Sequence, residues 1–141
     1  MHAVAVPVKA LSKAKRRLAP VASPLERGAI ALAMLEDVLD ATLPVHAWET
    51  WVISPDEVVL EVAASRGARA IPEEKGPLGA AIRQVEALAI ERGIDALAIL
   101  PGDLPLLTTT ALAGALRSAG RVARARGPAS CRAPAAPARP R

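Results

Sequence analysis

Short apolar segments alternate four times with helical segments along residues 1–120, and this alternation constrains the fold more than any other feature. The apolar segments are residues 3–8, 50–54, 69–72 and 96–100. Strands separated by helices predict a mostly parallel sheet with right-handed crossovers and helices on both faces. Strands covered on both faces are expected to be largely apolar, and these segments are. We therefore predict an α/β, Rossmann-like fold.

The helical segments carry the start and stop residues that helices require. Residues 23–26 read Ser-Pro-Leu-Glu, in which Ser is an N-cap, Pro is the first helical residue and Glu completes a capping box. Residues 54–57, Ser-Pro-Asp-Glu, repeat this pattern and predict a second capped start. Glycines at 67, 93 and 120 are expected to end the second, third and fourth helices.

The net charge of +4 is unevenly distributed. Residues 1–120 hold 12 basic and 14 acidic side chains, a net charge of −2, whereas residues 121–141 hold six Arg and no acid. Four prolines in those last residues oppose helix formation, so we expect a disordered Ala/Arg/Pro tail. A nucleic-acid module driven by this tail is one alternative, but two Trp without Phe or Tyr offer few surfaces for stacking bases. We therefore expect no nucleic-acid partner.

Apolar runs in this chain are short. None reaches the roughly 18 residues that a membrane span needs, and the first residues lack a secretory pattern. We expect a cytoplasmic protein with no membrane partner.

The loops that follow the strands of such a sheet form its ligand-binding edge. Residues 9–17, after the first strand, contain five cationic side chains, including three of the four lysines of the chain. Residues 101–105, after the fourth strand, contain one acid, Asp103, between two prolines. Cations that face phosphates and a carboxylate that holds Mg²⁺ would suit a phosphate-bearing ligand. A solvated basic loop and an acid that caps the next helix are the alternatives.

Glycine-rich phosphate-binding motifs are absent from the sequence. It contains neither G-x-G-x-x-G after the first strand nor the Walker motif G-x-x-x-x-G-K-[ST]. Phosphate binding would therefore depend on side-chain cations. Asp56 also follows a strand, but its place in the first turn of a helix predicts a structural role.

Three segments resemble the CofC-type guanylyltransferases of coenzyme F420 biosynthesis. They are residues 6–9 (Val-Pro-Val-Lys), 14–18 (Ala-Lys-Arg-Arg-Leu) and 100–107 (Leu-Pro-Gly-Asp-Leu-Pro-Leu-Leu), in the order of the family. The Ser-Pro-x-Glu-Arg helix start also matches, and the resemblance covers most of residues 3–120. It implies a Rossmann-like nucleotidyltransferase fold, related to the molybdenum-cofactor guanylyltransferases.

The resemblance also implies an activity. This is the transfer of GMP from GTP to the phosphate of phosphoenolpyruvate or 2-phospho-L-lactate, with release of pyrophosphate. It assigns nucleotide binding to Lys9, Lys15 and Arg17, Mg²⁺ binding to Asp103, and catalysis to Lys9 and Asp103. The expected partners are these small molecules. A homodimer, a non-catalytic GTP-binding remnant and another MobA-like nucleotidyltransferase remain open.

The chain departs from the family pattern in three respects. Arg16 replaces a Ser, and Pro77-Leu78-Gly79 replaces a Gly-Leu-Asn whose Asn lies at the nucleotide. The later strands of the family, its second metal-binding Asp and its Gly-Thr-Asn segment have no counterpart. We therefore expect residues 1–120 to be the N-terminal part of a nucleotidyltransferase domain, with low stability or solubility and weak or no catalysis.

Residues 121–141 have the composition that GC-rich codons give when they are read out of frame, which suggests a frameshift. We expect one of the two other reading frames after codon 120 to encode the missing Asp and a Gly-Thr-Asn segment. Sequencing the locus tests this directly. If neither frame encodes them, the frameshift hypothesis is wrong.

Overall fold

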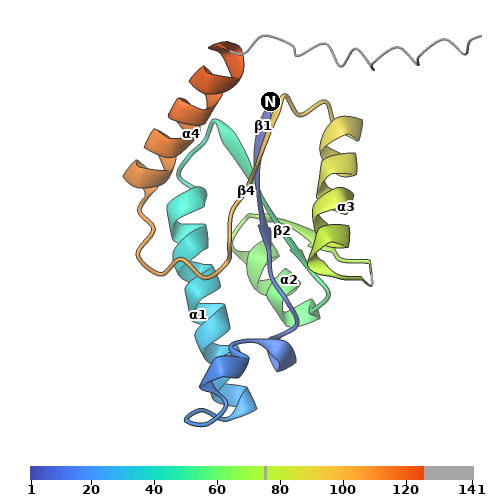
Figure 1. Cartoon of the computed structure of the whole chain (residues 1–141), viewed down its shortest axis with the longest axis vertical. Helices are drawn as coiled ribbons and strands as arrows, with labels where there is room; N and C mark the ends of the chain where they lie inside the picture. Colours follow the sequence, from blue (N-terminus) through green and yellow to red (C-terminus); the bar gives the residue numbers. More distant parts are fainter. Residues whose placement is uncertain (75, 126–141) are drawn as a thin grey trace, which may run out of the picture.

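The computed structural model describes residues 1–74 and 76–125 (Figure 1). Its strands are β1 (His2–Pro7), β2 (Trp48–Ser54), β3 (Arg69–Pro72) and β4 (Ala96–Ile99). Its helices are α1 (Pro24–Thr42), α2 (Glu57–Ser65), α3 (Leu78–Glu91) and α4 (Thr109–Ala125), with short 3₁₀ turns η1 (Leu11–Lys13) and η2 (Arg16–Leu18) after β1. The predicted alternation of strands and helices and the α/β fold are confirmed.

The strands form one parallel sheet in the order β3-β2-β1-β4. The chain runs from β1 outward through β2 to β3 and then crosses back, so that β4 pairs with the other side of β1. The order of the strands therefore reverses between β1 and β4. In open α/β sheets, ligands bind outside the carboxyl ends of the strands at such a switch point.

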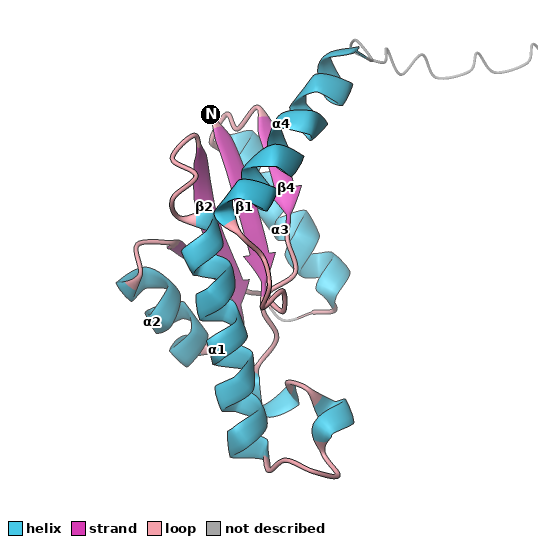
Figure 2. Ribbon diagram, turned by 90° about the vertical axis from the view of Figure 1, so that its left-hand side faces the viewer, coloured by secondary structure: helices cyan, strands magenta, loops and turns pink. Residues whose placement is uncertain are grey.

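Helices cover both faces of the sheet, and the residues of β1 divide between the two faces. Val4 and Val6 pack with buried residues of α1, α2 and α4, whereas Ala3 and Ala5 face the buried residues of α3. Figures 1 and 2 show α1 and α4 on one side of the sheet and α3 on the other. The small alanines leave room for Trp51, which is completely buried against α3.

The capping box at the start of α1 is confirmed. The Ser23 hydroxyl accepts a hydrogen bond from the backbone N–H of Glu26 at 3.3 Å, and the Glu26 carboxylate accepts one from the N–H of Ser23 at 2.7 Å. The predicted repeat at Ser54 is wrong, because Ser54 is the buried last residue of β2. Its hydroxyl instead accepts from the N–H of Asp56, which is the N-cap of α2.

The glycine stops are confirmed at two of the three predicted positions. Gly67 and Gly93 follow α2 and α3 with φ angles of +90° and +66°. The helix α4 continues past Gly120 to Ala125. A glycine inside a helix costs only about 1 kcal/mol relative to Ala, and the Arg and Ala residues that follow favour helix. The rest of the expected tail, residues 126–141, lies outside the described residues.

The two outer strands of the sheet, β3 and β4, differ in polarity. On β3, Arg69 pairs with Glu49 of β2 at 3.8 Å and Pro72 cannot donate to a further strand. The other edge strand, β4, reads Ala-Leu-Ala-Ile, and Ile99 is 41% exposed. Across residues 1–74 and 76–125, no helix is both long enough and apolar enough to cross a membrane.

Candidate active site

The loops after β1 and β4 lie against each other at the carboxyl edge of the sheet. The N–H of Val8 donates to the carbonyl of Ile53 at 2.9 Å, and the N–H of Leu100 donates to the carbonyl of Ala5 at 2.9 Å. These hydrogen bonds extend the sheet by one residue at the start of each loop. At Gly102, a Cβ atom would lie 3.1 Å from Val8 Cγ2, so glycine allows the turn before Asp103 to pass close to β1.

Lys15 and Asp103 form an ion pair at this end of the sheet, where the sequence predicts the ligand-binding loops. The Lys15 Nζ donates to Asp103 Oδ2 at 3.2 Å, although the two residues are 88 positions apart. The side chains are 24% and 56% exposed. Ion pairs exposed to this extent contribute about 0.2–1 kcal/mol. The pair therefore stabilises the fold little, and a ligand can exchange with either partner at low cost.

The backbone of Lys15 supports a functional interpretation of this pair. With φ +48° and ψ +43°, Lys15 is the one non-glycine residue in the described part of the chain with a positive φ. A left-handed conformation costs an L-residue roughly 1–2 kcal/mol. Strain of this kind collects at ligand sites and switches, where the surrounding structure holds it. The surface ion pair alone does not offset that cost.

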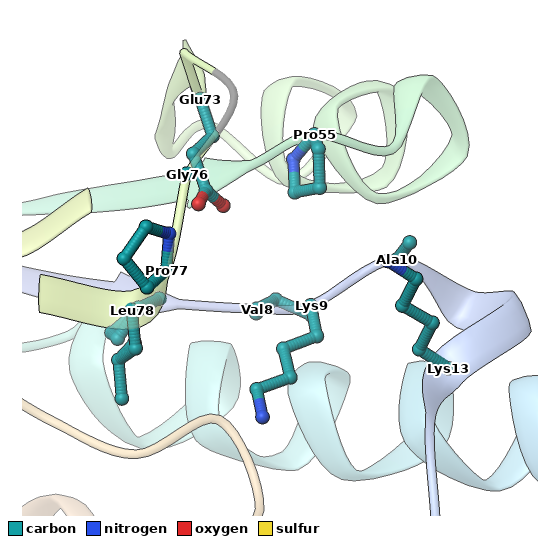
Figure 3. A pocket seen from close by; sticks show the side chains of 10 residues that line it. Val8, Lys9, Ala10, Lys13, Pro55, Glu73, Gly76, Pro77 and Leu78 are labelled. Carbon is teal, nitrogen blue, oxygen red and sulfur yellow. The ribbon is translucent and has the colours of Figure 1, made fainter. Parts of the chain in front are cut away.

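A cavity of about 350 Å³ opens at the same edge, beside the loop that follows β1 (Figure 3). Lys9 and Lys13 line it from this loop, and Glu73 and Pro77 line it from the connection between β3 and α3. Burial raises the pKa of the Glu73 carboxyl. The cavity thus contains one carboxyl group and lies beside the basic loop.

Asp56 holds the basic loop in place. Its Oδ2 accepts from the N–H of Leu11 at 2.9 Å, while its Oδ1 accepts from the N–H of Val58 at 3.1 Å. One carboxylate therefore caps α2 and fixes η1, which lies between Lys9 and Lys15. The predicted structural role of Asp56 is confirmed, and it includes positioning the loop.

The residues predicted from the sequence occupy different parts of this edge. Lys9 lines the cavity, and Lys15 and Asp103 form the ion pair. Arg17 lies exposed in η2, does not line the cavity and forms no ion pair with the acids of residues 1–74 and 76–125. Our sequence-based selection omitted Lys13 and Glu73. Lys13 belongs to the same basic loop as Lys9 and Lys15. Glu73 directly follows β3, and Asp103 likewise lies after the end of β4. Both omitted residues could therefore have been predicted by the same rule, that ligand-binding residues follow strands.

The site fits a metal ion that arrives with its phosphate ligand. Within the described residues, no group of three or more His, Cys, Asp or Glu side chains could enclose an ion. Mg²⁺ is commonly held by one or two carboxylates together with water and substrate phosphates. Asp103, more than half exposed at the switch point, suits that mode of binding.

Two solved structures share this fold. The chain is similar to a nucleotide-diphospho-sugar transferase from Desulfovibrio desulfuricans, with a TM-score of 0.69, 17% identity, and coverage of 84% of this chain and 55% of that one. It is also similar to CMP:2-keto-3-deoxy-manno-octonic acid synthetase, with a TM-score of 0.57, 18% identity, and coverage of 85% and 47%. The chain therefore shares its α/β fold with these two proteins.

Sequence comparison gives the family. The family model described as "Guanylyl transferase CofC like" matches residues 2–130, and the chain belongs to this family. Phosphoenolpyruvate guanylyltransferase of Rubrobacter xylanophilus is 40% identical over 115 residues, which are 82% of this chain and 56% of that protein. The protein of the same name from Mycobacterium leprae is 41% identical over 120 residues, covering 81% and 55%. The chain thus spans little more than half the length of these relatives.

The role of Asp56 gives a stability test. Asp56→Ala removes both the cap of α2 and the acceptor for Leu11, and we expect it to lower the free energy of unfolding by about 2–3 kcal/mol. Asp56→Asn keeps an oxygen for the cap and should cost less. Urea unfolding followed by circular dichroism measures both. Asp37→Ala on the exposed face of α1 is the matched control and should change stability by less than about 0.5 kcal/mol. Equal effects of Asp56→Ala and Asp37→Ala would contradict this role.

Proposed function

We propose that this protein takes part in guanylyl transfer from GTP to the phosphate of phosphoenolpyruvate or 2-phospho-L-lactate, a step of coenzyme F420 biosynthesis. The observation that carries the proposal is the Lys15–Asp103 pair at the switch point, beside a cavity lined by Lys9 and Lys13. Membership of the CofC-like family supports the same reaction, as do relatives named phosphoenolpyruvate guanylyltransferase.

The reaction needs positioning and charge neutralisation more than covalent catalysis. An oxygen of the acceptor phosphate attacks the α-phosphorus of GTP, and a new P–O bond forms as the bond to pyrophosphate breaks. Pyrophosphate leaves with the electron pair of that bond. Lys9, Lys15 and Arg17 would bind the triphosphate, and Lys13 adds a further cation from the same loop. Fixed cations would stabilise the charge that develops in the transition state.

Asp103 would hold Mg²⁺, which supplies neutralisation of the phosphate charge when it is bound. The Lys15 ammonium group can leave the Asp103 carboxylate and bind a phosphate oxygen instead, because the exposed ion pair between the two residues contributes little to stability. Lys9 and Asp103 would then be the catalytic residues. GTP and the two acceptors are small intracellular metabolites, so we expect a cytoplasmic protein.

A second candidate function is GTP binding without transfer. The observation that favours it is the single carboxylate at the metal position, Asp103, in the described part of the site. The two candidates differ in one measurement, since only the first predicts a guanylylated acceptor and pyrophosphate.

We expect Lys15→Ala and Asp103→Asn each to weaken binding of GTP in the presence of Mg²⁺ by about 10- to 100-fold, because each removes a charge-assisted contact. Isothermal titration measures the binding, and mass spectrometry of the products measures transfer to each acceptor. Arg92→Ala, at the end of α3 near the opposite edge of the sheet, is the control and should bind GTP as the unchanged protein does. Unaltered binding by both site variants would contradict the proposed site.

A further inference from the structure

The cavity beside the basic loop has mostly apolar walls. Prolines 7, 55 and 77, together with Val8 and Leu78, supply this apolar surface. Figure 3 shows the Glu73 carboxylate directed toward the space between Pro55 and Pro77, while the Lys9 ammonium group points away from it. A volume of about 350 Å³ falls within the range of small-ligand pockets, which are typically apolar with a few well-placed polar groups.

The backbone around Glu73 is fixed from two sides. The N–H of Glu73 donates to the carbonyl of Ser54 at 2.9 Å, which extends the pairing of β3 with β2. From α3, the side-chain amide of Gln84 donates to the carbonyl of Pro72 at 2.9 Å and accepts from the N–H of Glu74 at 3.0 Å. The Glu73 carboxylate is therefore presented from a held segment, and little ordering is needed when a ligand binds.

The charged groups lie in sequence along the carboxyl ends of the strands, from β3 to β4. Glu73 follows β3, Lys9 and Lys13 follow β1, and Asp103 follows the turn after β4. The strands β3 and β4 are three strand spacings apart, roughly 14 Å. A nucleotide with its phosphates at the loop after β1 and its metal at Asp103 would bring its base toward the cavity on the β3 side.

We propose that Glu73 selects guanine by accepting hydrogen bonds from its N1–H and its exocyclic amine, with the apolar walls of the cavity against the faces of the base. The inference rests on the proposed guanylyl transfer and names the residue that reads the base. Guanine presents two adjacent donors, which match the two oxygens of one carboxylate. Adenine presents an acceptor in place of N1–H, which faces the carboxylate unfavourably.

The partly desolvated setting of Glu73 increases the selectivity of this contact. Burial raises the pKa of its carboxyl, which reflects loss of water from around the charge. In such surroundings a satisfied hydrogen bond is stronger and an unmatched polar group costs more than in water. A base that leaves the carboxylate without a hydrogen-bond donor is therefore expected to bind less tightly than guanine.

The test compares three nucleotides and four proteins, which are the unchanged chain and its Glu73→Gln, Glu74→Gln and Lys15→Ala variants, by isothermal titration in the presence of Mg²⁺. GTP has both donors, ITP lacks the exocyclic amine, and ATP has neither in the same arrangement. We expect the unchanged protein to bind GTP more tightly than ITP, and ITP more tightly than ATP. Glu73→Gln, nearly the same in size, should weaken GTP binding about 10- to 100-fold and remove the difference between GTP and ITP. Glu74→Gln, at the exposed neighbouring position, should leave all three affinities unchanged.

The outcomes separate this inference from the proposed function. If Glu73→Gln keeps the preference for GTP over ITP while Lys15→Ala weakens the binding of both nucleotides, the site binds GTP and the proposed role of Glu73 is wrong. If the unchanged protein binds none of the three nucleotides, the proposed function fails and the inference fails with it. The Glu73 side chain forms no hydrogen bond or ion pair with the described residues, so we expect Glu73→Gln to fold as the unchanged protein does. Thermal unfolding of the variant checks this.

Discussion

The pairing of β1 on both sides is the constraint on which the rest of this structure depends. Parallel hydrogen bonding to β2 on one side and to β4 on the other brings together the ends of two strands that are more than 90 residues apart in the chain. A loop rich in cations and a turn with one carboxylate thereby become neighbours. Gly102 permits their close approach, and Asp56 fixes the basic loop from the other side.

The site is built with little contribution to stability from its own charges. The Lys15–Asp103 pair contributes about 0.2–1 kcal/mol, less than the roughly 1–2 kcal/mol that the left-handed backbone of Lys15 costs, so other interactions of the fold must hold this geometry. Val4 and Val6 on one face and the alanines of β1 on the other are completely or almost completely buried. This division allows polar groups at the sheet edge to remain available for a charged ligand.

Much of the fold could be predicted from local sequence, because capping residues and apolar runs act over a few positions. The alternation of elements and the capping box of Ser23 followed from such signals, whereas the contact of Lys15 with Asp103 joins residues 88 positions apart and depends on the pairing of β1 with β4. Ser54 was misassigned as a cap because the pattern does not reveal that the residue ends a buried strand. The strand order, and with it the distance between Glu73 and Asp103 along the edge, depends on long-range pairing that no local pattern contains.

The central claim is that nucleotide binds at the carboxyl edge of the sheet, across the loops after β1 and β4. A second cavity of about 470 Å³ lies at the opposite end of the strands, where β2 and β3 begin, and is lined by residues within 43–50 and 67–69. Amide chemical shifts recorded by NMR during titration with GTP and Mg²⁺ distinguish the two edges. Binding across the loops after β1 and β4 predicts shifts in residues 8–15, 73–74 and 100–104. Shifts confined to residues 43–50 and 67–69 would contradict it.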